Sequence, residues 1–313
     1  MSASGTAIAG LLALLAALAP AVASDYHLSF LLQLLMMIAL AQSWNLISGL
    51  TGYVSFGHAA FFGVGAYAGA LLLQAGWPWW PAVLAAGGIA LAVSVPLGFL
   101  TLRLRGPYFA IAMLGLNELG RIIASLWVGL TGGGDGIPLA PALLPSLQTN
   151  YYAMLALALA ACLLVTGVRG SRFGLELRAI REDEGAAEMV GVNTTRDKVT
   201  AFVLSALFPG AVGAVYAMYT SYIDPVSVFA PELNIQMIVI VLLGGSGTVW
   251  GPVIGAGIIM VTRELLWAQF PALHLALLGL LVIVIVLYLP RGILSLLERR
   301  HRARPGRASE EAG

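Results

Sequence analysis

Long apolar runs alternate with short polar connections along this chain of 313 residues. A helix needs about 20 apolar residues to cross about 30 Å of hydrocarbon. Runs of that kind predict membrane spans near residues 5–23, 28–48, 53–74, 79–101, 107–127, 150–168, 199–221 and 273–290. A further apolar region, 233–262, is interrupted by glycines at 244–247 and by Gly251-Pro252. The pattern predicts an all-α, polytopic membrane protein with about eight spanning helices and a re-entrant or broken helix pair.

Composition supports this class. Apolar residues make up 59% of the chain and charged residues 10%, against about 45–50% and about 25% in soluble domains. The apolar runs are continuous rather than alternating, which favours helices over a barrel. The single cysteine, Cys162, lies inside such a run, so we expect it to pack between helices.

One segment, residues 169–198, differs sharply from the rest. It holds 12 of the 31 charged side chains of the chain. A segment this charged has to lie in water between two spans. Residues 175–182 and 184–190 have helical character, Gly191 is a stop signal, and Asn193 or Thr194 can cap the following helix. Exposed helices of this kind are typical docking elements for a partner protein.

Basic residues set the predicted orientation. Fourteen of the 16 lie in the loop at 103–105, in the 169–198 loop or in the tail after residue 290. Because cytoplasmic loops collect Lys and Arg, we predict that all three lie in the cytoplasm, together with both termini. Region 233–262 must then begin and end outside, either as a re-entrant pair of half-helices or as two short crossings.

Two glycine-rich breaks, 49–58 and 244–257, have a similar composition of glycine and other small residues. In this topology they face opposite sides of the membrane, as an inverted repeat around a pathway would, although two unrelated packing motifs explain them equally well. The candidate residues for a translocation path or hinge are Asn45, Gly52, Gly57, His58, Gly245 and Gly247. Two of these residues also have a purely structural explanation. Asn45 is expected to form an interhelical hydrogen bond, and His58 to bond backbone carbonyls that the helix break leaves free.

Intramembrane charge is scarce. Glu118 and Arg121, three positions apart in a predicted span, are expected to form an ion pair on one helical face. The only lysine, Lys198, follows Asp197 rather than a glycine, so the chain has no P-loop. We find no nucleophile, general base or metal-ligand pattern, and predict neither an enzyme nor a cofactor. Any energy for transport must come from elsewhere.

Several ordered blocks carry a family resemblance. They are residues 48–70 (SGLTGYVSFGHAAFFGVGAYAGA), 104–115 (LRGPYFAIAMLG), 130–137 (LTGGGDGI), 171–191 (SRFGLELRAIREDEGAAEMVG) and 242–257 (LLGGSGTVWGPVIGAG). They resemble the inner-membrane permeases of branched-chain amino acid ABC importers, in particular the LivM type. This resemblance implies one permease domain over residues 1–290, a basic cytoplasmic tail over 291–313, and location in the bacterial inner membrane.

The resemblance also implies a coupling loop that engages cytoplasmic ATPases through an EAA-x3-G pattern. Here Gly185 replaces the leading glutamate, and Glu184 stands one position earlier. The coupling residues implied are Glu184, Ala186, Ala187, Glu188, Met189 and Gly191. The implied partners are a second permease of the LivH type, two ATPases of the LivG and LivF type, a periplasmic amino-acid-binding protein and membrane lipid, with no nucleic acid. A urea- or amide-type importer permease remains an alternative, as does a stand-alone channel or ion-coupled carrier.

Overall fold

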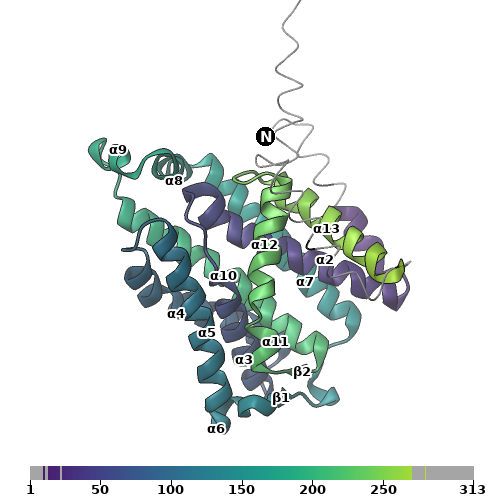
Figure 1. Ribbon diagram of the computed structural model, residues 1–313. Coiled ribbons are helices and arrows are strands. Elements are labelled where there is room, and N and C mark those ends of the chain that lie inside the picture. The colour runs from purple at the N-terminus through teal and green to yellow at the C-terminus, as the bar shows by residue number, and fades with distance from the viewer. Residues whose placement is uncertain (1–9, 11–12, 22, 270–278, 280–313) are drawn as a thin grey trace, which may run out of the picture.

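The computed structural model describes residues 10, 13–21, 23–269 and 279, and most of them form helices (Figure 1). The longer helices are α2 (Asp25–Trp44), α3 (His58–Gln74), α4 (Trp79–Thr101), α5 (Pro107–Leu126), α7 (Leu147–Gly170), α10 (Thr194–Thr220), α12 (Pro231–Gly244) and α13 (Trp250–Gln269). The shorter elements are η1 (Ala19–Ala21), η2 (Asn45–Gly49), α6 (Val128–Thr131), η3 (Gly133–Asp135), β1 (Ile137–Pro138), η4 (Pro141–Leu143), α8 (Arg172–Glu182), α9 (Glu184–Met189), β2 (Tyr222–Ile223) and α11 (Pro225–Val228).

Six helical segments in the described part of the chain are long and apolar enough to cross a membrane, and α3 is a shorter apolar helix. The prediction of an all-α, multi-pass membrane protein is therefore confirmed, whereas the count of eight spans is not. The predicted spans 5–23 and 273–290 fall partly or wholly outside the described residues. The basic tail, 291–313, also lies outside them.

The helix bundle has two distinct ends (Figure 1). At one end, here called the charged end, stand α8 and α9. At the other, the strand end, β1 pairs antiparallel with β2, so that Ile137 lies opposite Ile223. Each end thus gathers loops that are far apart in the sequence.

Helix α10 is the central element and packs against both α3 and α4. Small residues permit this close approach. A Cβ atom added to Gly65 would lie 2.0 Å from the carbonyl oxygen of Gly210, and one added to Gly213 would lie 2.1 Å from that of Phe62. The small-residue run after residue 58 is therefore a helix-packing surface, as its composition indicates.

The predicted span 53–74 begins later than expected, at His58. The chain before it bonds back to the preceding helix instead of continuing as a helix. The Trp44 indole donates to the Ser55 carbonyl at 2.7 Å, and the Ser55 N–H donates to Ser48 Oγ at 3.2 Å. Gly52, with a φ of 79°, allows the turn that this return requires.

The structure of region 233–262 differs from the prediction on two points. Helix α12 starts beyond β2 and α11 and runs to the charged end, where the Gly247 N–H donates to Asn45 and a Cβ on Gly247 would lie 3.1 Å from Arg181 Nη1. The chain therefore passes from one end of the bundle to the other before it breaks, and the re-entrant interpretation is wrong. The two glycine breaks touch each other and do not face opposite sides, which removes the basis for an inverted repeat.

Candidate coupling and translocation site

The 169–198 loop folds into the two predicted helices, α8 and α9, with Asp183 as the break between them. Ser171 and Asp183 cap these helices by accepting backbone N–H bonds at 3.3 and 2.9 Å. Asn193 caps α10 in the same way at 3.1 Å, as predicted. Such caps satisfy N–H groups that the first helical turn leaves free. The loop is consequently an ordered protrusion.

Gly191 ends α9 with a defined backbone motif. Its φ is 92°, which favours glycine. The Gly191 N–H donates to the Glu188 carbonyl at 3.0 Å, and the Val192 N–H donates to the Ala187 carbonyl at 3.0 Å. This pair of bonds is the Schellman arrangement that closes helix C-termini. The predicted stop at Gly191 is confirmed.

The predicted coupling residues divide into two groups. Ala186, Glu188 and Gly191 are exposed, and Met189 is 85% exposed next to Val190 at 79%. Ala187, by contrast, is 3% exposed and belongs to the core of the chain itself. Only the first group is available to another protein, and its apolar tip is unusual on so charged a loop.

Glu184 points toward the protein interior and joins three elements. Its carboxylate accepts a bond from Lys198 Nζ at 2.6 Å and another from the Tyr53 hydroxyl. Lys198, only 3% exposed, also lies 3.2 Å from the Tyr53 hydroxyl. Arg105 stands 3.9 Å from the same carboxylate. The network connects α9 to the N-terminal turns of α10 and to the break after α2.

The electrostatics of this cluster favour a charged Glu184. Burial opposes the ionised form, but the hydrogen bonds from Lys198 and Tyr53 outweigh it and hold the pKa of the Glu184 carboxyl below its usual value. Burial and the bond to Glu184 both raise the pKa of Tyr53, so its hydroxyl keeps the proton that it donates. The cluster is thus an ion pair with a neutral phenol as its third member.

A second connection runs from α8 to the first glycine break, and Asn45 joins the end of α2 to the second. Arg181 Nη1 donates to the Gly49 carbonyl. Asn45 donates from Nδ2 to the Thr248 carbonyl at 2.8 Å and accepts the Gly247 N–H at 2.8 Å. The prediction of Asn45 as an interhelical hydrogen bonder is confirmed, and its partner is the other glycine break.

The hinge candidates occupy close backbone approaches. Gly245 and Gly247 have φ values of 125° and 75°. A Cβ on Gly57 would lie 2.1 Å from Met113 Cε, and one on Gly52 would lie 3.2 Å from Arg181 Cγ. The positive φ values favour glycine at 52, 245 and 247, and the role of all these residues in a pathway stays a prediction.

His58 opens α3 and is fully buried. Its Nδ1 lies 3.1 Å from Ser55 Oγ, and Nε2 has no hydrogen-bond partner among the described residues. The expected bond to freed backbone carbonyls is wrong, since the partner is a hydroxyl. Asn234, from α12, accepts the Ala59 N–H at 3.0 Å and so caps α3 from a distance.

Glu118 and Arg121 form the predicted ion pair, with Arg121 Nε at 3.0 and 2.9 Å from the two carboxylate oxygens. Their side chains are 45% and 33% exposed, because this face of α5 is not covered by the described part of the chain. The pair is present, but it is not buried within the subunit.

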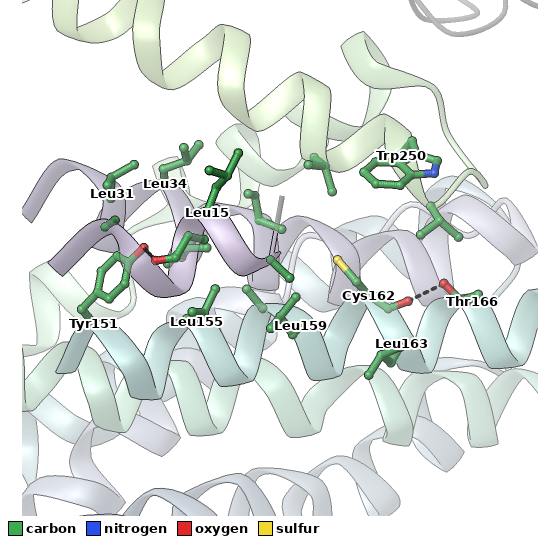
Figure 2. A pocket seen from close by; sticks show the side chains of 18 residues that line it. Leu15, Leu31, Leu34, Tyr151, Leu155, Leu159, Cys162, Leu163, Thr166 and Trp250 are labelled. Atoms are coloured by element: carbon green, nitrogen blue, oxygen red, sulfur yellow. Dashed lines mark hydrogen bonds between the residues drawn. The ribbon is translucent and has the colours of Figure 1, made fainter. Parts of the chain in front are cut away.

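An apolar cavity of about 780 Å³ lies between α2, α7, α13 and the residues around η1 (Figure 2). Its rim carries few polar groups: the Tyr151 hydroxyl donates to the Ala16 carbonyl at 2.8 Å, and Thr166 bonds the Cys162 carbonyl at 2.7 Å. None of the described residues that line it is charged, so these residues offer no ionic partner to a charged cargo.

Sequence reasoning missed several residues of the site. Tyr53, Arg181 and Asn234 act through partners more than 100 positions away, which no local pattern shows. Lys198 carried a signal, as the only lysine of the chain, but its burial did not follow from it. Within the described ranges, no group of three or more His, Cys, Asp or Glu side chains is placed to hold a metal ion.

Comparisons with known proteins agree with this architecture. The LivM permease protein of the high-affinity branched-chain amino acid transport system of Escherichia coli is 30% identical over 306 residues, covering 88% of this chain and 71% of that protein. The corresponding LivH protein of Escherichia coli is 24% identical, covering 87% and 97%. The autoinducer 2 import system permease protein LsrC of Klebsiella pneumoniae is 29% identical, covering 66% and 61%. No solved structure is significantly similar.

The family model described as the permease component of branched-chain amino acid transport systems matches residues 26–286. This match spans every helix from α2 to α13, including the 169–198 loop and both glycine breaks. The chain therefore belongs to the family of branched-chain amino acid transport system permease components.

Proposed function

We propose that this chain is a membrane-spanning subunit of an ATP-driven importer for branched-chain or related hydrophobic amino acids. It forms part of the translocation path and hydrolyses nothing itself. The observation that carries the proposal is the double connection of the 169–198 loop to the first glycine break, 49–58. Arg181 reaches Gly49, and Glu184 reaches Tyr53.

These contacts can transmit a movement of the loop to the interior of the protein. The outer surface of the loop presents Met189 and Val190 to a partner, while its inner surface is bonded to the segments that interrupt the helices. A displacement of the loop would pull on Gly49 and on the break at 245–249 through Arg181 and Asn45. In many transporters, discontinuous helices form the substrate site around which the two parts of the protein move.

The proposed assembly contains a second permease of the LivH type, two cytoplasmic ATPases and a binding protein that delivers the cargo. The loop at 103–105 and the 169–198 loop then face the cytoplasm of a bacterial cell, with both termini on the same side. Arg105 and Glu184 already meet at the charged end, which supports one common side for the two loops.

The test is reconstitution of the chain in liposomes with the two ATPases, the second permease and the binding protein that accompany it. We expect ATP-dependent uptake of labelled leucine, isoleucine or valine. Uptake by this polypeptide alone, or uptake of urea or amides with no amino acid uptake, would contradict the proposal.

The docking role has its own variant. Met189→Arg places a charge on the exposed apolar tip without touching the inner network, and we expect it to weaken ATPase binding and uptake together. Met189→Leu, which keeps an apolar side chain of similar volume, is the matched control and should behave as the unmodified chain. Equal uptake in both variants would remove the tip from the ATPase interface.

A further inference from the structure

Helix α5 presents two different faces. Phe109, Met113, Asn117 and Ala124 form its buried stripe toward α3 and α11. The opposite face carries large side chains that the described chain leaves exposed, among them Tyr108, Ile111, Leu114, Leu119 and Ile122. At the edge of this outward face lie Glu118 and Arg121, both half-exposed.

Position and exposure make the charged pair unusual. Glu118 is residue 12 and Arg121 residue 15 of a helix of 20 residues, so neither is at a membrane surface. A charged side chain at the centre of a spanning helix costs about 2.5–3.5 kcal/mol in lipid. The outward face of α5 therefore faces water or another protein rather than lipid.

Helix α4 supplies the contrast. Its outward face is also exposed, but it carries only apolar side chains, including Leu84, Ile89, Val93 and Phe99. This composition suits contact with lipid. The two neighbouring helices thus differ in that only α5 carries charged side chains on its outward face.

We infer that Glu118 and Arg121 form a recognition site for the charged ends of a zwitterionic amino acid, on a water-filled face of α5 that the second permease encloses. The inference rests on the proposed function and adds to it the place and the chemical class of the cargo. A free α-amino acid carries one carboxylate and one ammonium group, and is neutral overall, as the pair is.

The geometry fits an exchange of partners. Arg121 uses Nε and Nη2 for its bonds to Glu118, which leaves Nη1 available for a cargo carboxylate. The Glu118 carboxylate accepts a hydrogen bond from the ammonium group of the cargo. Leu114 and Ile122 stand one turn before and one turn after Glu118 on the same face, where they can contact an aliphatic side chain. A neutral amide has no charge to offer either residue.

The first test reads solvent access in the assembled importer. In a Cys162→Ala background, single cysteines at Gly115 and Ile122 report on the α5 face, and cysteines at Ile89 and Val93 on α4 are matched controls. A charged, membrane-impermeant methanethiosulfonate reagent should label both α5 positions and neither α4 position, and leucine delivered by the binding protein should slow the α5 labelling. Equal labelling of the two helices, or none on α5, would overturn the inference.

The second test reads recognition. Glu118→Gln and Arg121→Gln each remove one charge-assisted contact, and we expect the KM for amino acid uptake to rise about tenfold or more. The reversed pair, Glu118→Arg with Arg121→Glu, keeps an ion pair on α5 but inverts its direction, so uptake should stay impaired.

Unchanged uptake in a single variant, or full recovery in the reversed pair, would reduce Glu118 and Arg121 to a structural role and overturn the inference. Uptake by the unmodified importer tests the proposed function separately. If a charge variant fails to assemble, labelling at Gly115 and Ile122 decides, since those chains keep the pair intact.

Discussion

Asn45 and Gly247 stand 202 positions apart in the sequence and meet at the charged end of the bundle, where the Gly247 N–H donates to Asn45 Oδ1 at 2.8 Å. The side-chain amide of Asn45 also donates, from Nδ2, to the Thr248 carbonyl at 2.8 Å. One buried side chain thus closes the turn between α12 and α13 onto the end of α2. This contact fixes the two glycine breaks to each other.

Asn45→Leu should lower the free energy of unfolding by about 1–3 kcal/mol, because it removes two hydrogen bonds, to the half-buried Gly247 N–H and Thr248 carbonyl, each worth about 0.5–1.5 kcal/mol. Gly49→Ala should have a similar effect, since its Cβ would lie 2.0 Å from Asn45 Oδ1 and displace the amide. Thermal unfolding of the purified chain in detergent measures both. Gln74→Leu, which removes only one long amide bond at an exposed position, to the Pro138 carbonyl at 3.4 Å, is the control and should lose less. Unchanged melting of Asn45→Leu would show that the contact contributes nothing.

The ion pair of Glu184 gives a pH-dependent prediction. The pKa of its carboxyl lies below the ordinary value of 4.5 in the folded chain, because the bonds from Lys198 and Tyr53 outweigh its burial. A lowered pKa stabilises the fold above the ordinary value, and this contribution is lost as the pH falls through the folded pKa. The stability difference between the unmodified chain and Glu184→Gln should therefore shrink on acidification.

Unfolding curves recorded from neutral pH down to about pH 3 test this difference. Glu182→Gln, at an exposed position two residues earlier, is the control, and its stability should differ little from that of the unmodified chain at any pH. A difference for Glu184→Gln that is constant across the range would show that the carboxyl is not paired in solution.

Much of this fold could be predicted from local pattern. The bounds of α4 were predicted to the residue, and the loop helices with the Asn193 cap followed from charge, helical character and capping chemistry. The positions of distant segments relative to each other could not be predicted in this way. The predicted orientation, with 233–262 as a re-entrant pair, places the glycine breaks on opposite sides, whereas α12 continues from α11 across the bundle.

The site was predictable to the same extent. Glu118 and Arg121 are three positions apart, so helical geometry alone predicts their pairing. The family resemblance implies Glu184 as a coupling residue, but its partner Tyr53 lies 131 positions earlier, where no local pattern shows it. The burial of Lys198 depends on the packing of α10, which hydropathy does not describe.

Close packing of α3 on α10 predicts opposite effects for two glycines. Gly65→Ala should destabilise the chain by about 1–3 kcal/mol or more, because its Cβ would lie 2.0 Å from a backbone oxygen that cannot move away. Gly88→Ala, on the exposed face of α4, meets no atom within 4 Å and should stabilise by about 0.5–1 kcal/mol. Melting temperatures in detergent distinguish the two. The same sign for both substitutions would contradict the packing described for Gly65.

Gly191 tests the link between the shape of the loop and the use of ATP. Gly191→Pro removes the N–H that bonds the Glu188 carbonyl and cannot adopt the φ of 92°, so the end of α9 should open and shift Met189. We expect ATP hydrolysis by the reconstituted importer to continue while amino acid uptake falls, which lowers the ratio of cargo moved to ATP consumed. Gly191→Ala keeps the N–H and costs about 1–2 kcal/mol in backbone strain, so its loss should be smaller. Gly191→Asn keeps the N–H in a residue that tolerates this conformation, and serves as the control. A proline variant with an unchanged ratio would mean that the ATPases do not read the shape of α9.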